Sequence, residues 1–351
     1  MTEPAPAAGP QRLGRLDGLR GIAACVVAFG YHARLLFVQG AFAGAGPVVG
    51  WFHAWGWTFV DLFFLISGYI FAHVYLPGGT LAQPGGARRF VAARVARLYP
   101  LHLVMLCLMA ALFSAKPGND PANFMAHLAM LQAFTKPFAD TFDGPSWSIT
   151  IECLCYLVFM VAARAGGRSL ALVTGGAIVW GALVLVLAGS DSVGWTQFLL
   201  GRGLLGFFLG QALWHGRAQL ARVPAWLVAA LLAAGLLVPA GPVHPLLPLT
   251  LLAWPAALVL GLRAQSLERP AMLWLGDRSY AIYLIHMPLF EFTAKYLGLG
   301  RGGLPGILAI HLVLAAVVLA YADAAYRRIE RPARRALGAW LGAGRTVPLP
   351  A

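Results

Sequence analysis

Long apolar stretches recur along almost the whole chain, and they constrain its fold more than any other feature. A helix that crosses the hydrocarbon core of a bilayer needs about 20 apolar residues at a rise of 1.5 Å each. Ten segments meet this requirement, at residues 18–38, 54–76, 98–115, 146–165, 169–189, 196–214, 224–240, 246–262, 276–297 and 304–326. The sequence therefore predicts an all-α fold, a polytopic membrane helical bundle of about ten transmembrane helices.

The composition supports a membrane domain and excludes several other classes. Hydrophobic residues make up 60% of the chain and charged residues only 11%. An ordinary soluble domain is about 45–50% apolar and about 25% charged. A soluble enzyme, a disordered chain and a coiled coil are therefore excluded. The four cysteines lie in apolar runs without a CxxC pair or a disulfide pattern, so no metal site is expected.

The basic residues predict the orientation of the bundle. If the N-terminus is cytoplasmic, 20 of the 26 Lys and Arg residues fall in the inside segments, as the positive-inside rule requires. We therefore predict a multi-pass protein of the cell inner (plasma) membrane with both termini cytoplasmic. Its parts are a tail at 1–16, a transmembrane domain at 17–335 and a tail at 336–351. The topology explains the net charge of +13. Membrane lipid is therefore the expected partner, and nucleic acid is not expected to bind.

Six ionisable side chains lie near one level of the predicted bundle. Such groups cost about 2.5–3.5 kcal/mol each at the centre of a membrane helix, so they are functional candidates. They are His32, Asp61, Glu152, Arg202, His286 and Glu291. The first four lie roughly 10 Å below the outer surface at 1.5 Å per residue. This common level predicts a shared site or water-filled vestibule, with a structural hydrogen-bond network as the alternative.

A second polar layer is expected on the cytoplasmic side. Arg94 and Arg97 are three residues apart and share a helical face, and Arg20 enters its span at the same level. Three guanidinium groups at one depth can clamp phosphates. Taken alone, however, the cluster is better explained by positive-inside anchoring, which accounts for most basic clusters of this kind.

Six short motifs, in order from Arg15 to Arg335, resemble the signatures of the acyltransferase 3 family. The members of this family are multi-span membrane acyltransferases that modify bacterial surface sugars. The motifs are Arg15-Leu-Asp-Gly-Leu-Arg20 followed by His32; Asp61-Leu-Phe-Phe-Leu-Ile-Ser67-Gly68-Tyr69; Arg94-x-x-Arg97-Leu-Tyr99-Pro100; Trp147-Ser-Ile-Thr-Ile-Glu152-x-x-x-Tyr156; Ser279-Tyr280-Ala-Ile-Tyr283-Leu-Ile-His286; and Ile329-Glu330-Arg331-Pro332. Each falls on the span that the predicted topology assigns to it.

The resemblance implies an O-acyltransferase. Cytoplasmic acyl-CoA, most simply acetyl-CoA, would be the donor and co-substrate, and a hydroxyl of an envelope or exported glycan would be the acceptor. His32 is then the expected general base, and Asp61 at matching depth is expected to orient its imidazole. No metal and no tightly bound cofactor are expected.

The resemblance also assigns the remaining site residues. It favours the donor clamp over simple anchoring, with Arg20, Arg94, Arg97 and Tyr99 as donor-binding residues. Residues expected to bind the acceptor or organise the site are Ser67, Trp147, Glu152, Tyr156, Arg202, Tyr283, His286 and Glu291. The acceptor stays open among a lipid-linked glycan, peptidoglycan and a small glycoside.

One spacing departs from the family pattern. The family usually places ten residues between the first-span arginine and histidine, whereas Gly21–Tyr31 makes eleven here. One extra residue turns a helical face by about 100°. Either a π-bulge near Gly30 absorbs the extra residue, or His32 works from a shifted position while Tyr31 holds the usual spacing.

Two other functions compete with acyl transfer. A proton-coupled sugar or lipid exporter would also use intramembrane His, Asp and Glu. The sequence shows no internal repeat, however, which many transporters have. A scaffold for envelope assembly would explain neither polar layer. Consumption of acyl-CoA distinguishes the enzyme from the exporter.

Overall fold

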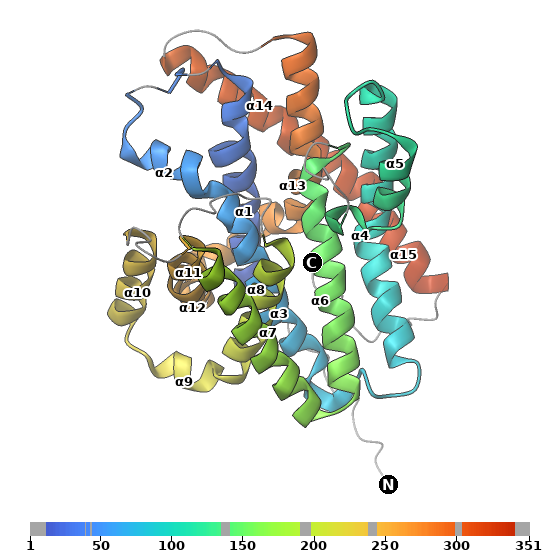
Figure 1. Cartoon of the computed structure of the whole chain (residues 1–351), viewed down its shortest axis with the longest axis vertical. Coiled ribbons are helices and arrows are strands. Elements are labelled where there is room, and N and C mark those ends of the chain that lie inside the picture. The colour runs from blue at the N-terminus through green and yellow to red at the C-terminus, as the bar shows by residue number, and fades with distance from the viewer. Residues whose placement is uncertain are drawn as a thin grey trace.

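The computed structural model describes residues 12–38, 40–42, 44–134, 141–189, 198–237, 244–298 and 304–340. Within these ranges the chain is helical and contains no strand, which confirms the all-α class (Figure 1). The α-helices are α1 (Gly14–Cys25), α2 (Pro47–Trp55), α3 (Phe59–Tyr75), α4 (Gly86–Phe113), α5 (Pro121–Leu128), α6 (Trp147–Arg164), α7 (Gly167–Ala188), α8 (Leu199–His215), α9 (Arg217–Arg222), α10 (Ala225–Leu237), α11 (Leu246–Pro248), α12 (Trp254–Arg263), α13 (Pro270–Tyr296), α14 (Leu304–Ala325) and α15 (Arg331–Trp340).

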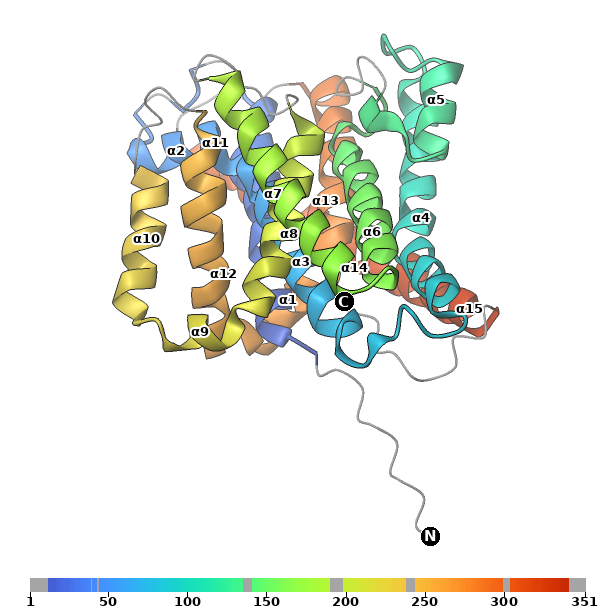
Figure 2. The same cartoon turned by 60° about the horizontal axis from the view of Figure 1, so that its bottom comes forward.

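Seven helical segments among the described residues are long and apolar enough to cross a membrane. They are Gly14–Leu36, Pro47–Tyr75, Gly86–Phe113, Gly144–Arg164, Gly167–Ala188, Leu246–Arg263 and Pro305–Leu337. Each coincides with one of the ten predicted spans. A polytopic helical bundle is thereby confirmed, and Figure 2 shows its long helices standing side by side.

The other three predicted spans are also helical, but they are shorter or more polar. Helix α8 has 17 residues and α10 has 13. Helix α13 has 27 residues and carries four charged side chains, Asp277, Arg278, Glu291 and Lys295. Ten crossings therefore stay a prediction, as does the cytoplasmic location of the termini.

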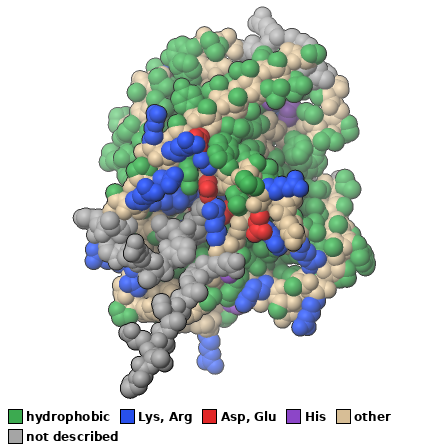
Figure 3. All heavy atoms as spheres, turned by 180° about the vertical axis from the view of Figure 1, so that it is seen from behind, with side chains coloured by type: hydrophobic (Ala, Val, Ile, Leu, Met, Phe, Trp, Pro, Cys, Tyr) green, Lys and Arg blue, Asp and Glu red, His purple; other side chains and the backbone are tan. Residues whose placement is uncertain are grey.

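Short helices lie at the two edges of the bundle. Helices α9 and α15 lie at one edge and α5 at the opposite one (Figure 2). Helix α5 packs onto the bundle with Asn123 and His127 buried. On the face shown in Figure 3, basic side chains gather over the middle and lower part, whereas the upper part is hydrophobic.

The predicted tails overlap with helices. Helix α1 begins at Gly14, inside the predicted tail 1–16, and residues 1–11 lie outside the described part of the chain. Helix α15 extends to Trp340, inside the predicted tail 336–351, and residues 341–351 also lie outside.

Close helix crossings at glycines position the site. Helix α3 packs against α8, and α1 packs against α13. A Cβ added at Gly68 of α3 would overlap the carbonyl oxygen of Phe207, and one at Gly210 of α8 would overlap that of Leu65. Small residues let membrane helices approach closely and gain dispersion energy without a hydrophobic driving force. The α3–α8 crossing thereby fixes Asp61 and Arg202 against each other.

The first span is not a uniform α-helix. Helix α1 ends at Cys25, a π-helix follows over Val26–Tyr31, and a 3₁₀-helix runs over His32–Leu36. A π-turn hydrogen-bonds from i to i+5 and so accommodates one additional residue. The predicted π-bulge near Gly30 is therefore confirmed, and it lies between Arg20 and His32.

Candidate active site

The first of two pockets contains the predicted arginines, and we call it the arginine pocket. Its cavity is small, at about 60 Å³. The polar side chains of its lining are Arg20, Ser67, Arg94, Arg97, Ser148, Glu152, Tyr156, Ser279, Tyr280 and Tyr283. The structure thus brings together α1 and α4, which the sequence expected to meet, and adds α3, α6 and α13.

Arg94 and Arg97 are buried in this pocket and incompletely paired. Nη1 of Arg97 donates to Oε2 of Glu330 at 3.0 Å, which gives the last sequence motif a structural role. Nη2 of Arg97 and Nε and Nη2 of Arg94 have no hydrogen-bond partner within the described part of the protein. Leaving a buried charged donor unsatisfied costs free energy, so an anionic ligand would complete this pocket.

Tyr99 does not belong to the arginine pocket. Its hydroxyl donates to the carbonyl oxygen of Leu128 at 3.0 Å, and its ring lines an apolar groove between α4 and α6. A residue two positions after Arg97 points about 200° away around the helix, so Tyr99 cannot share the direction of Arg97. The donor-binding assignment of Tyr99 is therefore not supported by its position.

Glu152 lies in the arginine pocket and not at the level of His32. Its Oε1 accepts a hydrogen bond from Oγ of Ser67 at 2.8 Å and another from the hydroxyl of Tyr156. The predicted single layer is thus divided between two pockets. A rise of 1.5 Å per residue gives depth along an ideal axis, but it does not give helix tilt or side-chain direction.

The second pocket contains His32, and we call it the histidine pocket. Its cavity is about 200 Å³. Its polar and aromatic lining is Tyr31, His32, Arg34, Trp57, Lys116, Trp147, Tyr283 and Glu291. Both Tyr31 and His32 reach this pocket, so the π-turn keeps the histidine in the site.

His32 and His286 form a hydrogen-bonded pair whose protonation can be deduced from geometry. Nδ1 of His286 lies 3.1 Å from the carbonyl oxygen of Ile282. A carbonyl oxygen only accepts, so this nitrogen carries the proton and Nε2 of a neutral His286 is an acceptor. Nε2 lies 2.9 Å from Nδ1 of His32, which must therefore donate. The remaining lone pair of His32 is then on Nε2.

The expected hydrogen bond between Asp61 and His32 is wrong. Both oxygens of Asp61 accept from Arg202, with Oδ1–Nε at 3.0 Å and Oδ2–Nη2 at 2.8 Å. Asp61 is 0% exposed and Arg202 1% exposed. A buried carboxylate gains most from a bidentate guanidinium, so it pairs with Arg202, and His286 is the partner that His32 receives.

The Asp61–Arg202 pair supports the wall of the histidine pocket. The guanidinium carbon of Arg202 lies 4.6 Å from the ring centroid of Trp57 and 5.1 Å from that of Trp147. A cation close to an indole face is attracted by the ring quadrupole. Arg202 therefore lies beside two aromatic side chains that line this pocket.

The rim of the histidine pocket contains residues that sequence reasoning missed. Nζ of Lys116 lies 2.9 Å from Oε1 of the predicted residue Glu291. The guanidinium of Arg34 stacks 3.7 Å above the ring of Tyr31. Arg34 and Lys116 were two of the six basic residues that do not fit the positive-inside pattern, and this exception was the signal that could have identified them.

Comparisons with known proteins match this arrangement to one family. A family model described as an acyltransferase domain, that of the acyltransferase 3 family, matches residues 13–322. The chain is also 33% identical over 208 residues to "Protein 2 in picA locus" of Rhizobium radiobacter, a match that covers 52% of this chain and 97% of the relative. No solved structure matches. Because the family match includes both pockets and nearly all of the helical bundle, the chain belongs to the acyltransferase 3 family.

Proposed function

We propose that this protein is a membrane O-acyltransferase that moves an acyl group, most simply acetyl, from acyl-CoA to a hydroxyl of an envelope or exported glycan. The observation that carries the proposal is the chain of hydrogen bonds from Ile282 through His286 to His32. It leaves a basic nitrogen in a pocket that adjoins a buried arginine cluster. A base beside an anion site fits acyl transfer from a phosphate-bearing thioester.

The reaction can be written with His32 as the only proton carrier. Nε2 of His32 takes the proton from the acceptor hydroxyl as its oxygen attacks the thioester carbonyl carbon. The C–S bond breaks, an ester forms, and His32 returns the proton to the departing thiolate. His286 holds the reactive tautomer of His32 through its hydrogen bond, the role that a carboxylate has in a serine hydrolase triad.

The two pockets suit different parts of the substrates. The unpaired nitrogens of Arg94 and Arg97 fit the phosphates of CoA, because guanidinium groups bind phosphate bidentately. Trp57 and Trp147 give the histidine pocket two aromatic walls, with polar groups at the rim to orient a sugar. The positive-inside pattern would place the arginine pocket towards the cytoplasm.

The test uses the purified protein in lipid nanodiscs with acetyl-CoA and an exported glycan. Thiol release and glycan acylation are measured together. We expect both activities, with loss of both in His32→Ala. Arg97→Ala should raise the KM for acetyl-CoA far more than Arg88→Ala, since Arg88 is exposed. Glycan flux in proteoliposomes without thiol release would instead favour the exporter.

A second pair of variants tests the histidine pair itself. His286→Gln keeps an acceptor for Nδ1–H of His32, whereas His286→Ala removes it. We expect His286→Gln to retain much more activity than His286→Ala. The matched control is His311→Ala, because Nδ1 of His311 also bonds the carbonyl four residues earlier, at 3.1 Å, but His311 lines neither pocket. Equal loss in both His286 variants would contradict the role given to His286.

A further inference from the structure

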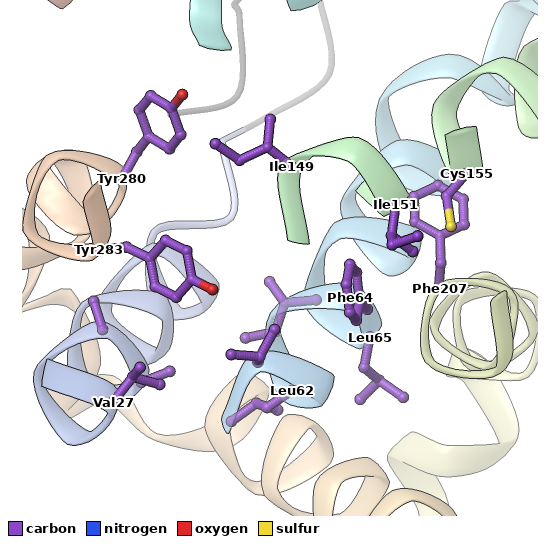
Figure 4. Close-up of a cluster of buried hydrophobic side chains, with 14 of the residues drawn as sticks. Val27, Leu62, Phe64, Leu65, Ile149, Ile151, Cys155, Phe207, Tyr280 and Tyr283 are labelled. Atoms are coloured by element: carbon purple, nitrogen blue, oxygen red, sulfur yellow. The ribbon is translucent and has the colours of Figure 1, made fainter. Parts of the chain in front are cut away.

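Two side chains line both pockets, Tyr283 of α13 and Val60 of α3. Every other residue that lines one of the two pockets is absent from the lining of the other. These two side chains therefore stand where the arginine pocket and the histidine pocket meet. Figure 4 shows Tyr283 projecting from α13 into the same buried region as the α3 side chains Leu62 and Phe64.

The hydroxyl of Tyr283 is held on both sides of this boundary. It donates to the carbonyl oxygen of Pro145 at 2.9 Å, and Pro145 lines the histidine pocket. It accepts from Oγ of Ser148 at 3.0 Å, and Ser148 lines the arginine pocket. Tyr283 is 7% exposed. Two hydrogen bonds, one to Ser148 of α6 and one to Pro145 just before it, thus hold the ring at this boundary.

The boundary lies directly beside the histidine pair. Tyr283 and His286 are three residues apart on α13, and their ring centroids are 6.0 Å apart. The ring of Phe63 lies 6.0 Å from Tyr283 on the α3 side. A thioester that enters through the arginine pocket would therefore meet the Tyr283 ring before it reaches His32.

We propose that Tyr283 and Val60 form a septum that keeps the thioester away from water in the histidine pocket until Tyr283 releases Pro145. The septum thereby favours transfer of the acyl group to a sugar hydroxyl over hydrolysis of the thioester. This inference rests on the proposed function. Without the septum, water attacks the thioester carbonyl and His32 passes its proton to the thiolate. The C–S bond breaks, and the products are a carboxylic acid and free CoA thiol.

The septum excludes a side reaction, a recognised function of closed active sites. A conformational step is implied as well, because the septum must open once in each transfer cycle. Tyr283 is the part of the septum that moves, because its ring is released when its two hydrogen bonds break. Val60 is a β-branched residue on a helix, where its side chain has one strongly preferred rotamer.

The experiment measures thiol release from acetyl-CoA in nanodiscs with and without the glycan acceptor. Tyr283→Ala should raise the ratio of hydrolysis to transfer by about tenfold or more, because water is no longer excluded. Val60→Gly should also raise this ratio. Because it keeps both Tyr283 hydrogen bonds, it provides the test if Tyr283→Ala folds poorly. Tyr283→Phe keeps the ring but loses both bonds, so its ratio should lie between those of wild type and Tyr283→Ala.

The outcomes separate the septum from the proposed function. If wild-type protein releases no thiol, the proposed acyl transfer fails. If wild type transfers the acyl group but Tyr283→Ala and Val60→Gly keep the wild-type ratio while total rates fall, the residues are structural and the septum is refuted. A raised ratio in Ser148→Ala, which removes the hydroxyl that donates to Tyr283, would support the role of this hydrogen bond in holding the septum closed.

Discussion

Removing one member of the Asp61–Arg202 pair should destabilise the bundle severely. The two side chains are 0% and 1% exposed and share two hydrogen bonds, at 3.0 and 2.8 Å. Loss of one partner leaves the other charge buried and unpaired, which costs about 3–5 kcal/mol. That is about two to three and a half powers of ten in the ratio of folded to unfolded protein. We therefore expect Asp61→Leu and Arg202→Met each to lower both folded yield and melting temperature in detergent.

The double variant distinguishes pairing from any direct role of Asp61 in catalysis. Asp61→Leu combined with Arg202→Met removes both charges and should recover much of the stability lost in either single variant, because no unpaired charge remains. Lys116→Ala is the control at a partly exposed pair, where about 1 kcal/mol or less is expected. A double variant as unstable as the worse single variant would refute the reasoning. So would an Asp61→Asn protein of wild-type stability that had lost all activity.

Three further predictions concern the helices around the site. Deleting Gly30 should restore an α-helical turn in place of the π-helix at Val26–Tyr31 and retain acyl transfer by His32. Inserting Ala beside Gly30 should abolish acyl transfer. Thiol release from acetyl-CoA measures the activity of both variants. Gly68→Ala should destabilise by about 1–3 kcal/mol through overpacking at α3–α8, while Gly175→Ala, where an added Cβ meets nothing, should be neutral in a thermal-shift assay. Burial next to His102 lowers the pKa of His127 from 6.5 to about 3. The free energy of unfolding should therefore fall by up to about 1.4 kcal/mol per pH unit below 6.5, because only the unfolded state takes up the proton there. His127→Gln should flatten the resulting dependence of melting temperature on pH.

Several of the helices followed from local sequence alone. Seven of the predicted spans coincide with helices long and apolar enough to cross a membrane, because run length and apolar content are properties of a single segment. The π-turn before His32 was also foreseeable, since one extra residue between two positions on the same helical face must be absorbed somewhere. The spacing of Arg94 and Arg97 on one helix and the matching level of Arg20 placed three arginines together, but only the family resemblance favoured a donor clamp over anchoring.

Partner choice inside the membrane could not be read from the same patterns. The predicted depth put Asp61 at the level of His32, but the close glycine crossing of α3 and α8 places Arg202 against Asp61 instead. Likewise, Glu152 shares its predicted level with His32, but its direction on α6 places it with Ser67 and Tyr156.

Sequence by itself thus determined the membrane class, the positions of seven apolar helices and most members of the two polar groups of residues. Only the tertiary structure decided that His286 pairs with His32, that Glu330 pairs with Arg97, and that Tyr283 separates the two pockets. The physical reason is that hydrophobicity sums along one segment, whereas a buried hydrogen bond depends on the distance and direction between side chains on different helices. Tilt, rotation and close packing set that geometry, and no single segment encodes them.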